Sequence, residues 1–435
     1  MMETQRGLAV TTNSIQVIEG INHFHNQILG SGNDAGAVLE AAKEHPESLL
    51  LQIYAAAFYL YAQENAATII ASDYLLQAEK QLRTANLREK MLYHALRAWE
   101  RLDYDAALTL LTSVVELFPR DTLALKFAEW LFYCTGQAYQ AKQFLALCEK
   151  CAQYNQDESH FLATHSFALE LCGQYPQAKA MAEEAVSLEV ITPWAHHTLA
   201  HVYLMEGDIE GGIKRLQVLQ KSWAHILPLL KGHNTWHLAL FQLANRDEDE
   251  TMKLFPNIFG SLPEILLEQL DAISLLWRME MAGFPQDQPL NTVFAHLGQH
   301  PFEYYIGFNN AHFIYCLARA KDVSCVEQAL MDLEFHINSL PEGNTKNLWQ
   351  ITSSLCQGIK AFALSDYKLA NILMEPVIDR CIQLGGSDAQ NEVYTQTYLL
   401  SLLKTGHTDK ANQFFLKYLP HYKNTALAEF WFSQN

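Results

Sequence analysis

The sequence predicts an all-α protein, folded as a right-handed superhelix of helix-turn-helix repeats. Three observations support this prediction. First, the turn residues Leu102, Gly136, Gly173 and Gly207 recur at intervals of 34, 37 and 34 residues. Second, the apolar residues between these turns follow the helical period of about 3.6. Third, the alternating β-branched runs that predict strands are nearly absent from the chain.

Each turn is followed by a second helix and then by a stop signal. After the first turn, apolar residues recur from Ala107 to Phe118, and Pro119 then ends the helix. The turns of this kind occupy residues 102–107, 134–141, 172–178 and 206–212, with weaker copies at 245–248, 364–370 and 404–411. This period and this order of helix, turn and helix are typical of the tetratricopeptide unit.

The repeats divide the chain into four segments of one continuous solenoid. Residues 1–90 form an N-terminal helical segment, in which helices are expected at 48–62 and 68–81. Residues 91–256 carry the clear tetratricopeptide-like repeats. Residues 257–350 are expected to be helical but irregular, with loops at 284–289 and 341–344, and the repeats resume over 351–435.

Composition restricts the partners that the protein can have. Apolar residues make up 49% of the 435 residues, and 48 acidic against 30 basic residues give a net charge of −18. Such a charge repels nucleic acid and anionic membranes, so neither is expected as a partner. The chain has no recognisable export signal or long apolar stretch, and its eight cysteines read as reduced thiols, so a cytoplasmic protein is expected.

Histidines gather in two short stretches about one repeat apart. His197 and His201 are four residues apart, as are His233 and His237, and a tryptophan, Trp194 or Trp236, accompanies each pair. Residues four apart lie on the same helix face, with about 5–6 Å between their Cβ atoms. Each pair therefore presents two imidazoles in one direction.

Tetratricopeptide geometry predicts where these side chains point. Positions 2, 5 and 9 of the first helix of a unit usually line the concave groove. The first stretch places Trp194, His197 and His201 at those positions, and a one-residue shift places His233 and Trp236 at positions 2 and 5 of the next unit. His237 lies beside them, so all six side chains are expected in one concavity.

The chain resembles the tetratricopeptide repeat protein 38 family. The matching stretches are residues 121–127, 194–205, 232–240, 309–313 and 383–390, in the same order along the chain. The resemblance implies a helical-repeat fold, but the family has no generally assigned biochemical role. Within the shared pattern lie His197, His201, His233, Trp236, His237, Asp271, Arg278, His312 and the Gly385-Gly386-Ser387 turn. His196 lies outside it, and Asn310 replaces a common Asp.

These observations predict a helical-repeat binding protein with a His/Trp-lined concave pocket for a peptide or a small molecule. In such a pocket, Arg278 could hold a carboxylate in bidentate fashion and the tryptophans could contact a flat or cationic ligand. The expected ligand-binding residues are Trp194, His197, Trp236, His237, Asp271, Arg278, Asn309 and His312.

The alternative is an enzyme that uses the histidines for metal-dependent or general acid/base chemistry. His201 and His233 are the candidate catalytic residues, because imidazole titrates near neutrality. A divalent transition metal is a possible cofactor, with His197, His201, His233 and His237 as ligands. Neither histidine pair contains the Glu of an HExxH motif, so the usual metalloprotease mechanism is not expected. A third interpretation is purely structural: histidines that hydrogen-bond to neighbouring helices.

Overall fold

The computed structural model is helical almost throughout and confirms the all-α prediction. It describes residues 1–298 and 305–433. Within this part of the chain, the only sheet is an antiparallel pair of two-residue strands near the N-terminus. Every described helix is too short or too polar to cross a lipid bilayer.

The chain forms two compact units, which are described separately. Unit 1 comprises Met1–Leu199 and Lys221–Leu230, and unit 2 comprises Ala200–Gln220 and Lys231–Asn435. The division passes through one continuous helix, α11 (Pro193–Met205), between Leu199 and Ala200, and through the first turn of another, α13 (Pro228–Ala244).

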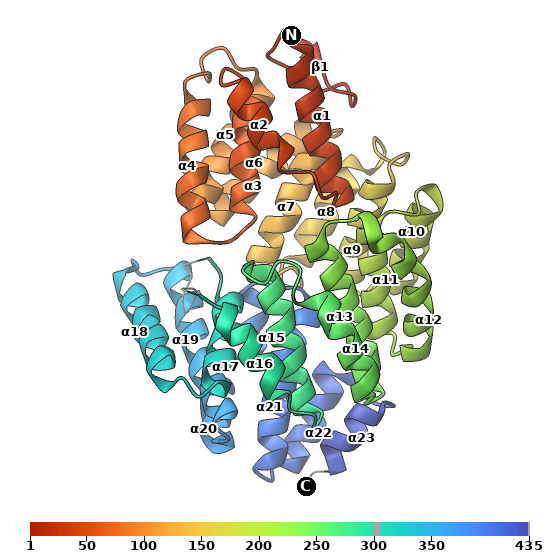
Figure 1. Ribbon diagram of the computed structural model, residues 1–435, viewed down its shortest axis with the longest axis vertical. Helices are drawn as coiled ribbons and strands as arrows, with labels where there is room; N and C mark the ends of the chain where they lie inside the picture. Colours follow the sequence, from red (N-terminus) through yellow and green to blue (C-terminus); the bar gives the residue numbers. More distant parts are fainter. Residues whose placement is uncertain (299–304, 434–435) are drawn as a thin grey trace. The chain divides into compact units, whose positions relative to one another are not determined.

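Unit 1 consists of helices packed as neighbouring antiparallel pairs (Figure 1). Its elements are β1 (Met2–Glu3), β2 (Ala9–Val10), α1 (Ile15–Gly30), α2 (Ala37–Glu44), α3 (Leu49–Leu60), α4 (Asn65–Glu79), α5 (Leu87–Glu100), α6 (Tyr104–Leu117), α7 (Thr122–Cys134), α8 (Ala141–Ala152), α9 (Ser159–Leu171), α10 (Tyr175–Leu188), the start of α11 and most of η1 (Gln220–His225).

Unit 2 is built in the same way, and α15, α17 and α21 form its most deeply buried layer. Its elements are the rest of α11, α12 (Ile209–Leu219), α13, α14 (Glu248–Ile258), α15 (Leu266–Met281), α16 (Asp287–His296), α17 (Gly307–Arg319), α18 (Val323–Ser339), α19 (Asn344–Ala363), α20 (Tyr367–Met374), η2 (Ile378–Gln383), α21 (Asp388–Lys404), α22 (Thr408–Tyr418), η3 (Pro420–Tyr422) and α23 (Ala426–Ser433).

The predicted turns are helix-hairpin turns with a left-handed residue at the predicted position. Leu102, Gly136, Gly173 and Gly207 have φ of 59°, 90°, 73° and 70°. At three of them the next N–H donates to a carbonyl five residues earlier, which closes the C-terminus of the first helix. An aspartate often follows and caps the second helix, as Asp208 does by accepting from the Gly211 N–H at 2.9 Å.

The same hairpin also occurs where the sequence shows no clear copy. Gln63, Gly283 and Lys321 have positive φ between paired helices, within the segments 1–90 and 257–350. Gln63 and Lys321 are not turn-forming residue types, so the sequence pattern misses them. The two expected N-terminal helices are α3 and α4, and α4 begins at Asn65, three residues earlier than predicted.

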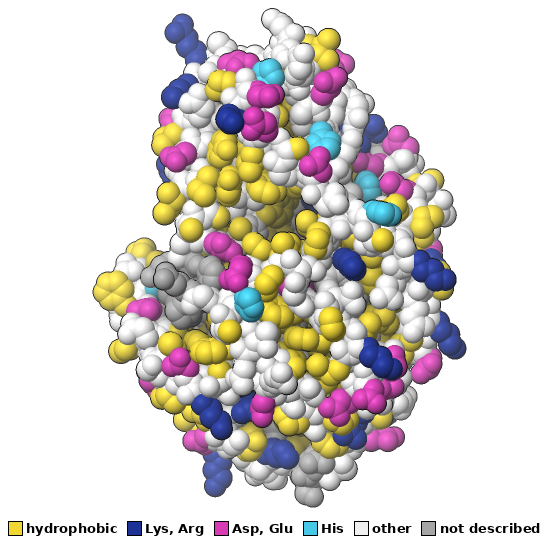
Figure 2. Space-filling view, viewed as in Figure 1, with side chains coloured by type: hydrophobic (Ala, Val, Ile, Leu, Met, Phe, Trp, Pro, Cys, Tyr) yellow, Lys and Arg dark blue, Asp and Glu magenta, His cyan; other side chains and the backbone are white. Residues whose placement is uncertain are grey.

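The surface has mixed charge on the face that Figure 2 shows. Lys and Arg side chains lie there among Asp and Glu side chains instead of forming one block. On this face acidic side chains are therefore interspersed with basic ones.

We expect Gly207→Ala to lower the urea midpoint of unit 2 more than Gly406→Ala. Both glycines are left-handed hairpin residues, with φ of 70° and 76°. A Cβ at Gly207 would lie 3.0 Å from the His421 carbonyl oxygen, whereas a Cβ at Gly406 would meet no atom within 4 Å. The left-handed conformation costs Ala about 1–2 kcal/mol at both positions, and only Gly207→Ala adds the close contact. Equal urea midpoints would contradict this account.

Candidate functional site

The two histidine stretches fold as helices α11 and α13, so the predicted i, i+4 pairs exist. His197 and His201 lie on α11, and His233 and His237 lie on α13. His201 is fully buried, and His197 and His237 are buried almost as deeply. His233 differs, because its side chain keeps 16% of its surface exposed.

Within unit 2, His237 lies between His201 and His233. The ring centroids of His201 and His237 are 4.6 Å apart, and those of His237 and His233 are 4.9 Å apart. Three imidazoles from two neighbouring helices are therefore in mutual contact. We call His201, His233 and His237, together with Asp271 and Asp388, the histidine cluster.

A carboxylate holds each end of this row of rings. The Nδ1 atom of His233 is 2.9 and 3.1 Å from the two carboxylate oxygens of Asp271, on α15. The Nδ1 atom of His201 is 2.9 Å from Oδ1 of Asp388, the first residue of α21. A carboxylate beside Nδ1 helps to orient an imidazole ring.

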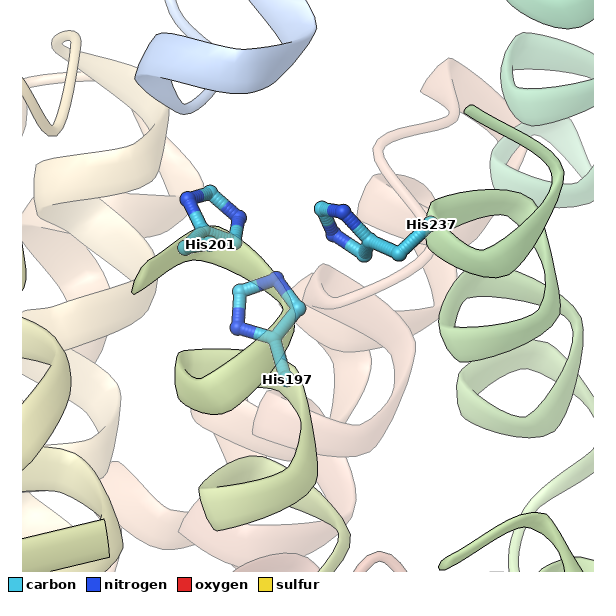
Figure 3. Close-up of side chains that lie close together, drawn as sticks. All are labelled: His197, His201 and His237. Carbon is cyan, nitrogen blue, oxygen red and sulfur yellow. The ribbon is translucent and has the colours of Figure 1, made fainter. Parts of the chain in front are cut away.

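His197 occupies the turn of α11 before His201. Because one helix carries both residues, the position of His197 relative to His201 is fixed by helix geometry. Within unit 2, the ring of His237 on α13 points toward the ring of His201 on α11 (Figure 3). His233, another predicted metal ligand, contacts His237 as well.

Trp236 is fully buried, and its ring already has polar neighbours. The imidazole of His233 stacks on it at 5.4 Å with an angle of 10° between the planes. The guanidinium of Arg278 lies 5.2 Å from the indole centroid. Trp236 therefore packs against two side chains, whereas the sequence predicted a ligand contact.

Arg278 binds backbone, although the sequence suggested that it could clamp a carboxylate. Its Nη2 donates to the carbonyls of Ala389 and Gln390 at 2.8 and 3.2 Å, and its Nη1 donates to the Ser274 carbonyl at 3.3 Å. Burial lowers the pKa of Arg278. These contacts fix the first turn of α21, where Asp388 lies.

His312 and Asn309 lie on α17 and are both fully buried. The Nδ1 of His312 is 2.9 Å from the Phe308 carbonyl and 3.3 Å from the Tyr394 hydroxyl, and Trp277 packs against the ring edge. His312 thus belongs to an aromatic environment of its own. The neighbouring Asn310 donates its amide to the Ile306 carbonyl at 3.1 Å.

In unit 1, Trp194 and His196 have structural partners. The ammonium of Lys126 lies 3.6 Å from the Trp194 ring centroid, and the His197 ring meets the same indole edge-on at 5.4 Å. His196 is fully buried, and its Nδ1 accepts a hydrogen bond from the Trp223 indole at 2.9 Å. For His196 the structural interpretation therefore applies.

Two surface hollows lie in the described part of the structure. One, of about 390 Å³, lies beside Arg246 and Phe284, and the other, of about 680 Å³, lies beside Tyr139 and Cys172. None of the predicted site residues lines either hollow. The side chains of His201 and His237 are buried, and His233 is the most exposed histidine of the cluster.

By spacing alone, the CxxC pair, Cys148 and Cys151, is a candidate redox or metal site. All eight cysteines are free, and both members of this pair are buried. Burial raises the pKa of Cys148 well above its usual value and that of Cys151 to about 12. Such thiols stay protonated at neutral pH, which argues against redox or metal chemistry at this pair.

Asp388 is the residue that sequence reasoning missed. It belongs to the stretch 383–390, but no local pattern connects it with His201, which lies 187 positions earlier. The available signal is the Ser387-x-x-Gln390 capping box, which predicts a helix starting at Asp388. The capping box predicts where the helix starts, but it does not predict that Asp388 lies beside His201.

A search against models of known protein families found no match for this chain.

We expect the stability of unit 2 to fall as the pH decreases from about 6.5 towards 3, in part because of His312. Burial lowers the pKa of His312 to about 3, so the unfolded chain binds a proton at this residue in a range where the folded chain does not. Its stabilising effect is complete above pH 6.5 and is lost as the pH falls through this range, with a slope of up to about 1.4 kcal/mol per pH unit.

Urea unfolding at several pH values measures this effect. His312→Gln should reduce the dependence of the free energy of unfolding on pH by an amount that corresponds to up to one proton. His25 and His165, in unit 1, have similarly lowered pKa values of about 3 and 4. They affect both proteins equally, so the difference between the variant and the wild type isolates His312. Parallel slopes in the two proteins would argue against a neutral buried His312.

Proposed function

We propose that this chain binds a small polar molecule at the histidine cluster, on a scaffold of tetratricopeptide-like repeats that form a right-handed superhelix. The observation that carries this proposal is the row Asp388–His201–His237–His233–Asp271, in which a carboxylate orients each outer imidazole. Polar side chains are costly to bury unless they are paired, so such a concentration in a core favours a functional role.

The burial of the cluster favours a small ligand over a peptide. A peptide needs an open groove along which it can lie, but His201 and His237 are almost completely buried. His233 and Asp271 are the accessible end, with 16% and 10% of their side-chain surfaces exposed. We therefore assign the first contact with the ligand to His233.

A second candidate function is general acid/base catalysis by the Asp271–His233 pair. The short contacts of Asp271 to Nδ1 of His233 favour it, because a carboxylate at this position orients the ring for proton transfer. In this role the His233 imidazole takes a proton from water as the water oxygen attacks the carbonyl carbon of an ester. The tetrahedral intermediate then expels the alcohol, which takes the proton back from the imidazolium. Asp271 stabilises the imidazolium that forms.

Two further features belong to the same proposal. The sequence resemblance supports a relationship with the tetratricopeptide repeat protein 38 family. Free cysteines, most of them buried, support a reducing compartment, and we propose the cytoplasm.

We expect the purified protein to hydrolyse the activated ester p-nitrophenyl acetate with saturation, which would report both a bound small molecule and a reactive imidazole. His233→Gln should lower the rate at least tenfold, since a positioned general base contributes about 10²–10⁴. Asp271→Asn should lower kcat more than it changes KM, because the imidazole loses its orienting carboxylate.

His407→Ala is the matched control, because His407 is exposed and its ring lies beside Thr405 within its own turn. It should hydrolyse the ester at the wild-type rate and thereby measure the contribution of surface histidines. Circular dichroism and thermal melting check that each variant is folded. A folded His233→Gln protein with wild-type kinetics would refute the assignment of this site.

A further inference from the structure

We propose that Lys126 of unit 1 is a nucleophilic amine that condenses with a small aldehyde to form an imine, with Glu129 as the proton donor. This activity goes beyond the proposed function and does not depend on it, because these residues lie in unit 1 and the histidine cluster lies in unit 2. The observation that carries it is a buried lysine whose ammonium contacts the carboxylate of Glu129 and the indole of Trp194.

Lys126 and Glu129 lie one turn apart on α7, so helix geometry keeps their side chains together. Nζ of Lys126 is 2.5 Å from Oε2 of Glu129, and the two side chains keep 7% and 5% of their surfaces exposed. The Trp194 ring covers the amine, with its centroid 3.6 Å from Nζ. Lysine is seldom buried, and it is buried here beside a group that can take its proton.

Burial gives this ion pair access to a neutral form. Removal from water lowers the pKa of Lys126 and raises that of Glu129, and each charge offsets only part of this effect on the other group. Transfer of one proton from Nζ to Oε2 produces a neutral amine beside a carboxylic acid. The amine is then a nucleophile, as in other lysines that are desolvated in apolar surroundings.

The two groups supply what imine formation requires. The lone pair of Nζ attacks the aldehyde carbon, and Glu129 passes one amine proton to the carbonyl oxygen, which gives a carbinolamine. Glu129 then donates its own proton to the hydroxyl, the C–O bond breaks and water leaves. The product is a protonated imine beside the Glu129 carboxylate. The buried charges therefore stay balanced, as they are in the ion pair of the free protein.

The surroundings favour a small, flat and uncharged aldehyde. A charged substrate would bring an uncompensated charge into a buried site, whereas the indole of Trp194 offers an apolar face. Trp194 is half-buried and is the second residue of α11, and residues 187–191 just before this helix are exposed. Rotation of the Trp194 side chain toward this exposed segment uncovers the amine while the helices stay in place.

The test is reductive trapping in the full-length protein. The protein is incubated at pH 7 with benzaldehyde and sodium cyanoborohydride, which reduces imines to stable secondary amines, and peptide mass spectrometry identifies the modified lysine. We expect Lys126 to be labelled at least about ten times faster than the exposed lysines, because an amine in water is almost fully protonated at this pH. Labelling of Lys126 no faster than that of the exposed lysines would overturn the proposal.

Two variants separate the roles of the pair. Lys126→Arg keeps a positive charge beside Glu129 and removes the nucleophile, so labelling at this position should disappear. Glu129→Gln keeps the amine and removes the proton donor, so labelling of Lys126 should slow at least tenfold, since a positioned acid contributes about 10²–10⁴. A wild-type labelling rate in a folded Glu129→Gln protein would refute the role of Glu129.

If Glu129→Gln does not fold, the pH dependence of wild-type labelling replaces it. The proton of the buried pair moves between Nζ and Oε2, so the reactivity of Lys126 should change little with pH. Exposed amines become more reactive as the pH rises from 7 to 9, because more of them lose a proton. The ratio of Lys126 labelling to exposed-lysine labelling should therefore fall over this range, and a constant ratio would contradict a neutral buried amine.

Lys142→Arg is the matched control, because Lys142 is an exposed lysine on the neighbouring helix α8. This variant should leave labelling of Lys126 unchanged. His233→Gln should also be labelled at Lys126 like the wild type while losing esterase activity. The two proposals therefore fail separately: esterase activity without labelling of Lys126 removes only the amine site, and labelling without esterase activity removes only the site in unit 2.

Discussion

The buried guanidinium of Arg278 organises the centre of unit 2. One side chain from α15 contacts the Trp236 indole of α13 and binds the Ala389 and Gln390 carbonyls at the start of α21. Three helices that are distant in sequence are thereby fixed to one another. Asp271 lies two turns earlier on α15 and Asp388 lies at the start of α21, so the same contacts set both carboxylates beside their histidines.

A second buried ionic network supports the same helix. Glu392, one turn after Asp388, accepts from the Tyr422 hydroxyl at 3.1 Å and pairs with His421 at 2.7 Å. The pKa of His421 is raised: burial lowers it, and the charge and hydrogen bond of Glu392 outweigh that effect. Removing one member of such a buried pair leaves an uncompensated charge, which is far more costly than losing an exposed pair. Arg278 therefore anchors the first turn of α21, and Tyr422 and His421 anchor the second.

The repeat pattern and the histidine pairs were predictable because both are local. A helix hairpin that turns this tightly needs a residue in the left-handed conformation. Glycine adopts this conformation readily, so Gly136, Gly173 and Gly207 indicate the positions of such turns. The turns at Gln63 and Lys321 have the same left-handed backbone conformation but lack the glycine, so the sequence does not predict them. Likewise, a spacing of four residues places His197 beside His201 in any helix.

By itself, the sequence determined the all-helical fold, the hairpin turns and the two histidine pairs, since helix period and turn chemistry act within a few residues. The tertiary structure alone decided which partners these side chains have. It placed Asp388 beside His201 and Arg278 beside Trp236, and it separated His312 from the cluster. The first two contacts join residues 187 and 42 positions apart, and the packing of whole helices selects them, which local patterns do not encode.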